Sequence, residues 1–136
     1  ELGVRVASAP ETMNFDVKTM ACAWSHKSAA AIAGLGSFGL HRMLITDAGC
    51  AGRCGSLVID APLTPTSRPQ PERCLYFYDG SCTYCADACP PAVLTEAPAG
   101  EPNLDKHGCW SYINEVSGGD CCGKCATGPC ALGPAV

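Results

Sequence analysis

The stretch "DGSCTYCADACPP", residues 79–91, decides how this chain can fold. Three cysteines and a proline match the last four positions of C-x2-C-x2-C-x3-C-P, a ligand run that binds iron–sulfur clusters in bacterial proteins: Cys82, Cys85, Cys89 and Pro90. Asp79 stands where the first cysteine of that run belongs. The stretch therefore offers three thiols at ligand spacing and needs a fourth from elsewhere in the chain.

The nearest upstream thiol is Cys74, which extends the pattern to C-x7-C-x2-C-x3-C-P. A longer loop is acceptable because the entropy of loop closure rises slowly with length. A similar pattern, C-x12-C-x2-C-x4-C, recurs in "CWSYINEVSGGDCCGKCATGPC" with Cys109, Cys122, Cys125 and Cys130. This repetition predicts two metal clusters rather than one.

In proteins with two such clusters, the fourth cysteine of each run ligates the other cluster. The predicted ligands of one [4Fe-4S] cluster are therefore Cys74, Cys82, Cys85 and Cys130. Those of the other are Cys109, Cys122, Cys125 and Cys89. Crossed ligation would let the metal replace a hydrophobic core in a segment that is rich in proline.

Two other arrangements of the thiols stay open. One zinc ion bound by Cys82, Cys85, Cys122 and Cys125 would leave Cys74, Cys89, Cys109 and Cys130 without a function. Six disulfides in an exported protein would use all twelve cysteines. Cys121 is interpreted as a spare thiol, with ligation in place of Cys122 as the alternative; Cys22, Cys50 and Cys54 are interpreted as small buried hydrophobic residues.

Composition divides the 136-residue chain near position 66. Only three of the twelve cysteines precede that position, and the net charge of −4 lies entirely after it. The proline-rich stretch "LTPTSRPQP", residues 63–71, predicts an extended linker, and hence two units, 1–66 and 67–136. Because the chain begins at Glu1 without methionine, we expect it to be a processed or excised piece of a longer protein.

Charge and hydropathy also limit the partners. Phosphate contacts need clustered lysine and arginine, so the acidic second unit predicts no nucleic-acid binding by this chain alone and favours a basic protein partner. No apolar run of 18 residues and no basic-then-apolar leader are present, which predicts a cytoplasmic protein that does not span a membrane.

The first unit shows stronger signals for regular structure. Residues 3–10 predict a short strand and a turn, and an alanine-rich helix should start at Ser25 or Ser28 and stop at Gly34. "HRMLIT", residues 41–46, predicts a short helix or strand. "GSLVIDAPL", residues 55–63, predicts a strand with Val58 and Ile59 in the core.

Gly34, Gly36 and Gly39 match G-x-G-x-x-G letter for letter, and Asp60 follows at the distance of a ribose-binding acid. A dinucleotide fingerprint, however, follows a buried strand of β-branched residues, and here the preceding residues are alanine-rich. A helix end with a tight turn is the competing interpretation.

Several of these segments together resemble the C-terminal part of the epoxyqueuosine reductase family and its relatives, the reductive dehalogenases. The resemblance covers residues 24–133 and is carried by "AAAIAGLGSFGLHRMLIT", "GRCGSLVIDAPL", "CLYFYDGSCTYCADACP", "CWSYINE" and "CCGKCATGPC". It implies an α+β fold: a partial nitroreductase-like, cobalamin-domain-like α/β segment over 1–66, followed by a ferredoxin-like domain with two [4Fe-4S] clusters over 67–136. It also implies that Gly34, Gly36 and Gly39 contribute to a cofactor or acceptor site.

The sequence departs from the family in two places. Leu40 and His41 stand where the queuosine-type reductases carry Lys-Asn, and the upstream region that supplies the family's catalytic acid is absent. No catalytic residue is therefore assigned. His26, His41 and His107 are interpreted as surface or structural histidines, because the sequence identifies no partner for them.

The sequence predicts an electron-transfer module that works with a redox partner protein or with an upstream domain of a longer chain. An alternative is a fragment of a cobalamin-dependent reductase that acts on a modified nucleoside or an organohalide. A second alternative is a zinc-stabilised interaction module. Whether the chain is an enzyme stays open; if it is one, it is an oxidoreductase.

Overall fold

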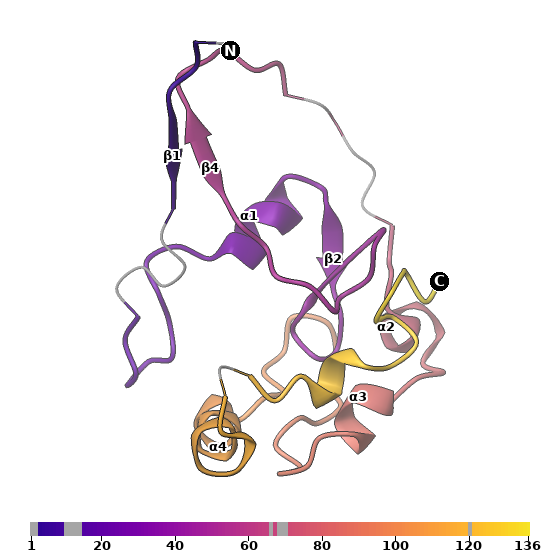
Figure 1. The fold of residues 1–136 in the computed structure, drawn as a ribbon. Helices are drawn as coiled ribbons and strands as arrows, with labels where there is room; N and C mark the ends of the chain where they lie inside the picture. Colours follow the sequence, from indigo (N-terminus) through magenta and orange to yellow (C-terminus); the bar gives the residue numbers. More distant parts are fainter. Residues whose placement is uncertain (1–2, 10–14, 66, 68–70, 120) are drawn as a thin grey trace.

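The computed structural model describes residues 3–9, 15–65, 67, 71–119 and 121–136. Short helices and two separate two-stranded antiparallel sheets alternate with long irregular segments (Figure 1). The elements are β1 (Val6–Ser8), α1 (His26–Ile32), β2 (Gly36–Phe38), β3 (Leu44–Thr46), β4 (Leu57–Ile59), α2 (Leu75–Asp79), α3 (Tyr84–Asp87) and α4 (Lys106–Tyr112). A π-helical turn, Ile113–Ser117, continues α4, and a 3-10 turn spans Lys124–Ala126. This mixed content agrees with the predicted α+β class; the predicted linker over 63–71 lies partly outside the described residues.

The strands β1 and β4 form a ribbon that projects from the rest of the molecule (Figure 1). Val6 pairs with Ile59, and the Arg5 side chain forms an ion pair with Asp60 beyond the end of the strands. Both strands were expected from the sequence. The predicted core position of Val58 is wrong, because its side chain is 65% exposed, and Ile59 is only half-buried. Among the described elements β4 pairs with β1 alone, so no second layer covers its apolar residues.

Helix α1 begins and ends as the sequence predicted. The Ser25 hydroxyl accepts a hydrogen bond from the Ser28 N–H at 3.2 Å, which satisfies a donor of the first turn. At the other end Gly34 adopts a left-handed conformation with φ of +72°. Two backbone bonds, from Gly34 to Ala31 and from Leu35 to Ala30, then close the last turn in the manner of a Schellman motif.

The glycine segment continues into the β2–β3 hairpin. Of the stretch 41–46, predicted as a short helix or strand, Leu44–Thr46 is a strand and residues 41–43 belong to the turn. Gly36 pairs with Thr46, and a Cβ atom at position 36 would lie 2.2 Å from the carbonyl oxygen of Ile45. A Cβ at Gly39 would lie 2.9 Å from the His41 ring. Helix α1 precedes these glycines and β2 begins at Gly36, whereas a dinucleotide fingerprint follows a strand and opens a helix. The left-handed conformation of Gly34 and the tight packing at Gly36 and Gly39 account for glycine at all three positions. The contribution of these glycines to a cofactor site stays a prediction.

The core draws on both sides of position 66 and is unusually rich in sulfur. Its buried members are Leu40, Ile45, Cys50, Cys74, Cys85 and Leu94. Partly buried Cys89, Cys125 and Cys130 pack against them. The hairpin therefore supplies the aliphatic side chains of Leu40 and Ile45 to a core in which three of the six buried members are cysteines.

Hydrogen bonds also join the hairpin segment to the cysteine-rich part. The buried Asn103 amide donates to the carbonyl oxygens of Leu40, at 2.9 Å, and Thr95, at 2.8 Å. The Cys50 N–H donates to the carbonyl oxygen of Cys130 at 2.9 Å, and Ala51 repeats this contact with Ala131. These hydrogen bonds join residues from both predicted units, 1–66 and 67–136. The division into two units stays a prediction.

A membrane-spanning helix needs about 20 apolar residues. No helix in the described part of the chain has the length and the apolar character to cross a membrane.

The contact at Gly36 predicts that Gly36→Ala destabilises the fold by about 3 kcal/mol, because an added Cβ would clash with the backbone of β3 rather than with a movable side chain. Urea unfolding followed by circular dichroism measures this loss. Gly52→Ala is the matched control, since a Cβ there meets no atom within 4 Å. Equal stability of the two variants would contradict the tight pairing of the hairpin.

Candidate metal centre

A first group of thiols lines one small pocket in the cysteine-rich part. Its members, called here the first sulfur group, are Cys74, Cys82, Cys85 and Cys130. Cys74 precedes α2 as its N-cap residue, Cys82 lies between α2 and α3, Cys85 belongs to α3, and Cys130 comes from the C-terminal segment. The four thiols predicted for one cluster therefore face the same space, although they come from segments far apart in the sequence.

A second group of thiols is recognised because its members lie close enough to raise one another's pKa. Burial, followed by the neighbouring thiols of Cys89 and Cys122, raises the pKa of Cys109 on α4. Burial raises the pKa of Cys125, and Cys109, Cys122 and Cys89 raise it further. These four residues, the second sulfur group, are the set predicted for the other cluster. Cys125 also lines the pocket of the first group, so the two groups adjoin.

Burial disfavours the ionised form of two thiols of the first group, Cys85 and Cys130. Burial, followed by Cys74, raises the pKa of Cys85 to about 12. Burial, followed by Cys50, raises the pKa of Cys130 to about 12. Thiolates are the metal-binding form of cysteine, and a bound cation stabilises them where burial alone does not. A site lined by several such sulfurs therefore suits a metal centre rich in thiolate ligands.

The spacing of the sulfurs distinguishes the kinds of metal centre. A tetrahedral zinc ion with Zn–S bonds of about 2.3 Å holds its thiolates about 4 Å apart. Among the described residues, one group of three or more metal-ligating side chains has all its ligand atoms within 4.8 Å of one another: His41, Cys50 and Cys130. The zinc set considered from the sequence, Cys82, Cys85, Cys122 and Cys125, does not converge in this way. A four-iron cluster binds each thiolate to a different iron and so suits more widely spaced sulfurs.

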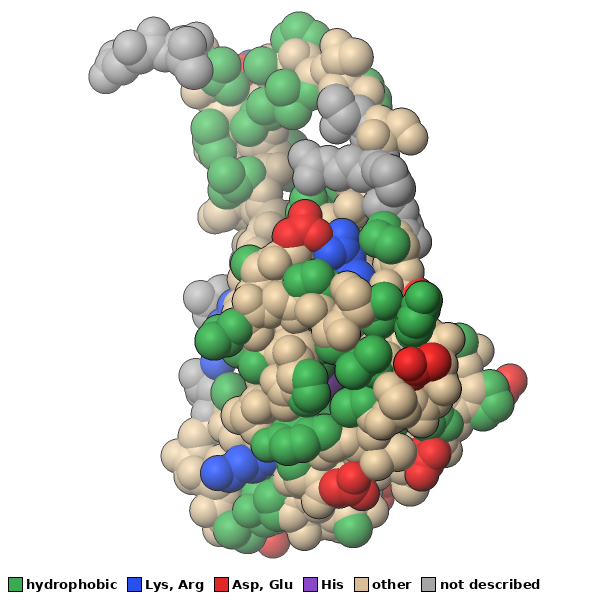
Figure 2. Space-filling model, turned by 90° about the vertical axis from the view of Figure 1, so that its right-hand side faces the viewer, with side chains coloured by type: hydrophobic (Ala, Val, Ile, Leu, Met, Phe, Trp, Pro, Cys, Tyr) green, Lys and Arg blue, Asp and Glu red, His purple; other side chains and the backbone are tan. Residues whose placement is uncertain are grey.

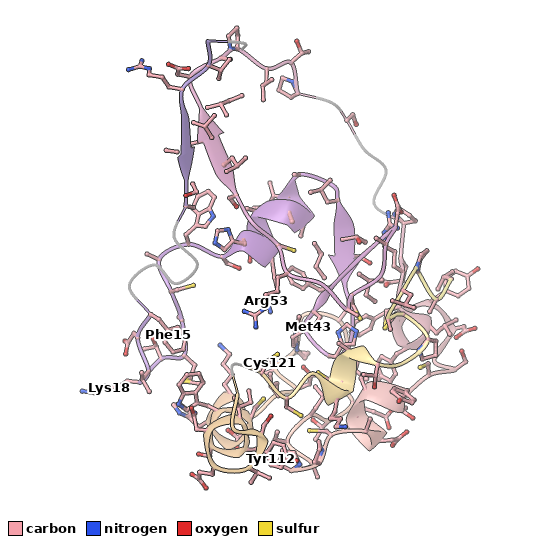
Figure 3. The ribbon with its side chains drawn as sticks, viewed as in Figure 1. Phe15, Lys18, Met43, Arg53, Tyr112 and Cys121 are labelled. Atoms are coloured by element: carbon pink, nitrogen blue, oxygen red, sulfur yellow. The ribbon has the colours of Figure 1, made fainter. Side chains whose placement is uncertain are left out.

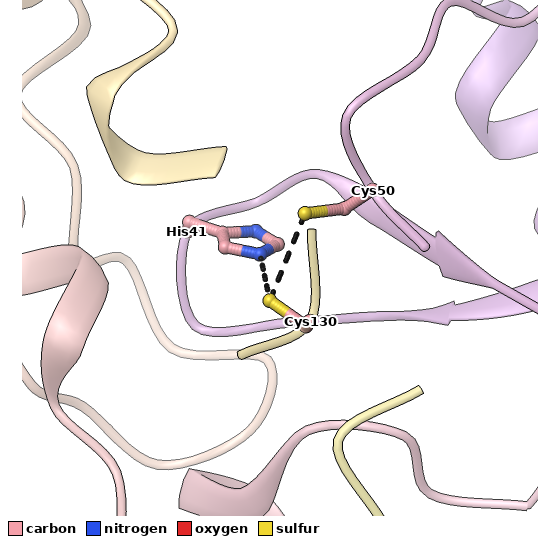
Figure 4. Close-up of side chains that lie close together, drawn as sticks. All are labelled: His41, Cys50 and Cys130. Atoms are coloured by element: carbon pink, nitrogen blue, oxygen red, sulfur yellow. Dashed lines mark hydrogen bonds between the residues drawn. The ribbon is translucent and has the colours of Figure 1, made fainter. Parts of the chain in front are cut away.

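His41 and Cys50 were not recognised as neighbours of the metal centre from the sequence. His41 is 4% exposed, and its Nε2 lies 3.2 Å from the Cys130 sulfur (Figure 4). Burial, followed by the charge of Lys27, lowers the pKa of His41 to about 4, so the ring is neutral at physiological pH. The statement that His41 has no identifiable partner is thus corrected: its partner is 89 positions away in the sequence, where no local pattern reveals it.

Cys50 is buried, as predicted, but it is also part of this site. Its sulfur lies 3.6 Å from that of Cys130 (Figure 4), and burial raises its pKa. The remaining cysteines lie further out: Cys22 and Cys54 are half-buried, and Cys121 is exposed opposite Arg53, at 3.9 Å (Figure 3). All twelve cysteines are free thiols, and the disulfide alternative gains no support.

Charge is distributed unevenly around the two groups. On the face shown in Figure 2, acidic side chains are scattered over the lower part of the molecule. A groove of about 580 Å³ beside Cys109 is lined instead by Lys27, Arg42 and Lys106, with Phe15 and Trp110. The two aromatic rings lie 5.6 Å apart between centroids. Basic groups thus gather next to the second sulfur group: Lys27 and Arg42 come from the first 66 residues, and Lys106 from the acidic segment that follows.

Comparison with known proteins supports the sequence resemblance in part. Epoxyqueuosine reductase of Yersinia pestis is 38% identical to this chain over 88 residues, which make up 64% of the chain. The chain is a distant relative of that reductase. The match covers 19% of the reductase, so the chain spans about a fifth of its length. No family model matches the chain, and no solved structure matches it.

The doublet at 121–122 generates a prediction. Because Cys122 interacts with Cys109 and Cys125 while Cys121 is exposed, Cys122→Ser should remove about half of the bound metal. Cys121→Ser, the matched neighbour, should keep nearly all of it. Metal analysis of the two purified variants shows which cysteine of the doublet is the ligand. Loss of metal in the Cys121 variant, with metal kept in the Cys122 variant, would make Cys121 the ligand.

Proposed function

We propose that this chain is an iron–sulfur electron-transfer module that holds two [4Fe-4S] clusters. The first sulfur group would bind one cluster and the second sulfur group the other. The supporting observation is that Cys130 joins Cys74, Cys82 and Cys85, while Cys89 joins Cys109, Cys122 and Cys125. Each run thus contributes one thiol to the group of the other run, which is the crossing seen in proteins with two clusters.

The protein contributes burial and proximity. Bound clusters would supply reversible one-electron chemistry. Cys74 and Cys85 are buried in the core and, with Leu40 and Ile45, provide an apolar surrounding that limits access of water. Cys125 adjoins both groups, which places the two binding sites next to each other. Adjoining sites favour a module that passes electrons rather than one that stores a structural ion.

We further propose that the second unit is ferredoxin-like and that the first is a partial nitroreductase-like α/β segment. The relationship to epoxyqueuosine reductase supports this assignment, since the matched stretch is longer than either cysteine run. The electron partner would be a redox protein or another domain of a longer chain. The net charge of −4 after position 66 favours a basic docking surface on that partner.

The same relationship supports a second candidate, a fragment of a cobalamin-dependent reductase that acts on a modified nucleoside or an organohalide. Titration of the purified chain with cobalamin, monitored by the corrin absorption bands, separates the candidates. Stoichiometric binding would favour the reductase fragment, and no binding would favour the electron-transfer module.

Anaerobic preparation should yield about eight irons and about eight sulfides per chain, with a low-potential paramagnetic signal on reduction. Cys74→Ser should lose about half of the iron and lower the stability, because binding and folding are coupled where thiols form the core. Cys54→Ser is the control, since Cys54 is half-buried outside both sulfur groups. Fewer than two irons with one zinc per chain would overturn the proposal.

A further inference from the structure

The hydrogen bonds of the His41 ring define where its proton lies. The backbone N–H of Met43 donates to Nδ1 at 3.0 Å, so Nδ1 is an acceptor and carries no proton. A neutral imidazole with an accepting Nδ1 must carry its proton on Nε2. That nitrogen lies 3.2 Å from the Cys130 sulfur (Figure 4). His41 therefore donates an N–H···S hydrogen bond to Cys130, and the backbone of the hairpin sets this direction.

Cys50 offers a second donor to the same sulfur. Its sulfur is 3.6 Å from that of Cys130, and its own backbone N–H is bonded to the Cys130 carbonyl oxygen at 2.9 Å. Either sulfur of this pair could donate the hydrogen bond. When Cys130 is a metal-bound thiolate it has no proton to donate, so the Cys50 S–H becomes the donor. Cys130 would then accept from both the hairpin turn, through His41, and the loop that follows the hairpin, through Cys50.

We propose that His41 and Cys50 are positioning residues that donate hydrogen bonds to the ligand sulfur of Cys130 and raise the reduction potential of the first cluster. This inference rests on the proposed function. Reduction adds negative charge to a cluster and its thiolates, and donors aimed at a ligand sulfur stabilise that charge. Both donors are buried, at 4% and 2% exposure, so water competes little for the sulfur and their effect is strong.

The consequence for the module is an asymmetry between its two clusters. The donors act on Cys130, whereas Cys89, Cys109, Cys122 and Cys125 belong to the adjoining group. The two donors should therefore raise the potential of the first cluster and leave that of the second unchanged.

Potentiometric titration of the reconstituted protein, followed by electron paramagnetic resonance, tests the inference. His41→Leu should move the midpoint potential of one cluster to a more negative value and leave the other unchanged, and Cys50→Ala should move the same cluster in the same direction. His41→Gln, which keeps an amide donor near the position of Nε2, should restore most of the lost potential. His26→Gln is the control, because the His26 ring contacts Ser56 at 2.9 Å rather than a ligand sulfur.

Iron and sulfide counts on every variant distinguish failure of this inference from failure of the proposed electron-transfer function. Full iron content with unchanged potentials in His41→Leu and Cys50→Ala would overturn this inference and leave the electron-transfer module intact. Lack of clusters in the unsubstituted protein would overturn the proposed function itself. If His41→Leu does not assemble, the potential of Cys50→Ala decides; loss of one whole cluster in Cys50→Ala would make Cys50 a ligand and reject its function as a donor.

Discussion

Convergence of cysteine sulfurs from distant segments is the constraint on which the rest of this molecule depends. Cys74, Cys85 and Cys130 line one pocket, and burial raises the pKa of Cys85 and of Cys130 to about 12. A small chain can bury only a modest share of its surface. In this chain, cysteines make up half of the buried members of the core. Such an interior becomes favourable when a metal centre compensates the negative charge of the sulfurs.

The hairpin β2–β3 supplies the aliphatic side chains against which these cysteines pack. Its close pairing at Gly36 places Leu40 and Ile45 against the sulfurs, where they are almost completely buried. The Asn103 amide holds the connection between the two strands by bonding the Leu40 carbonyl oxygen. The hairpin thus packs aliphatic side chains against the thiols. Through His41 it also contributes a polar contact to Cys130.

The relationship to epoxyqueuosine reductase and the geometry of the thiols support the same function from independent directions. The relationship concerns 88 residues of sequence, whereas the geometry concerns which thiols face one another. The fold brings Cys130 to the pocket lined by Cys74, Cys82 and Cys85, and it brings Cys89 within electrostatic reach of Cys109 and Cys125. Exposed apolar residues on the β1–β4 ribbon, such as Leu57 and Val58, lie far from this centre and have no part in it.

Local spacing in the sequence determined most of the candidate ligands, because a loop of two to four residues keeps the sulfurs of two cysteines close together, whereas Cys74 and Cys109 precede loops of seven and twelve residues. It also determined the limits of α1, where Ser25 and Gly34 act on the adjacent turn alone. Burial of Val58 could not be judged in this way, since alternation of apolar residues predicts a strand but does not say whether a second layer covers it. Tertiary structure alone decided that His41 and Cys50 meet Cys130, because contacts across 89 and 80 positions depend on how the hairpin packs and on no pattern within reach of either residue.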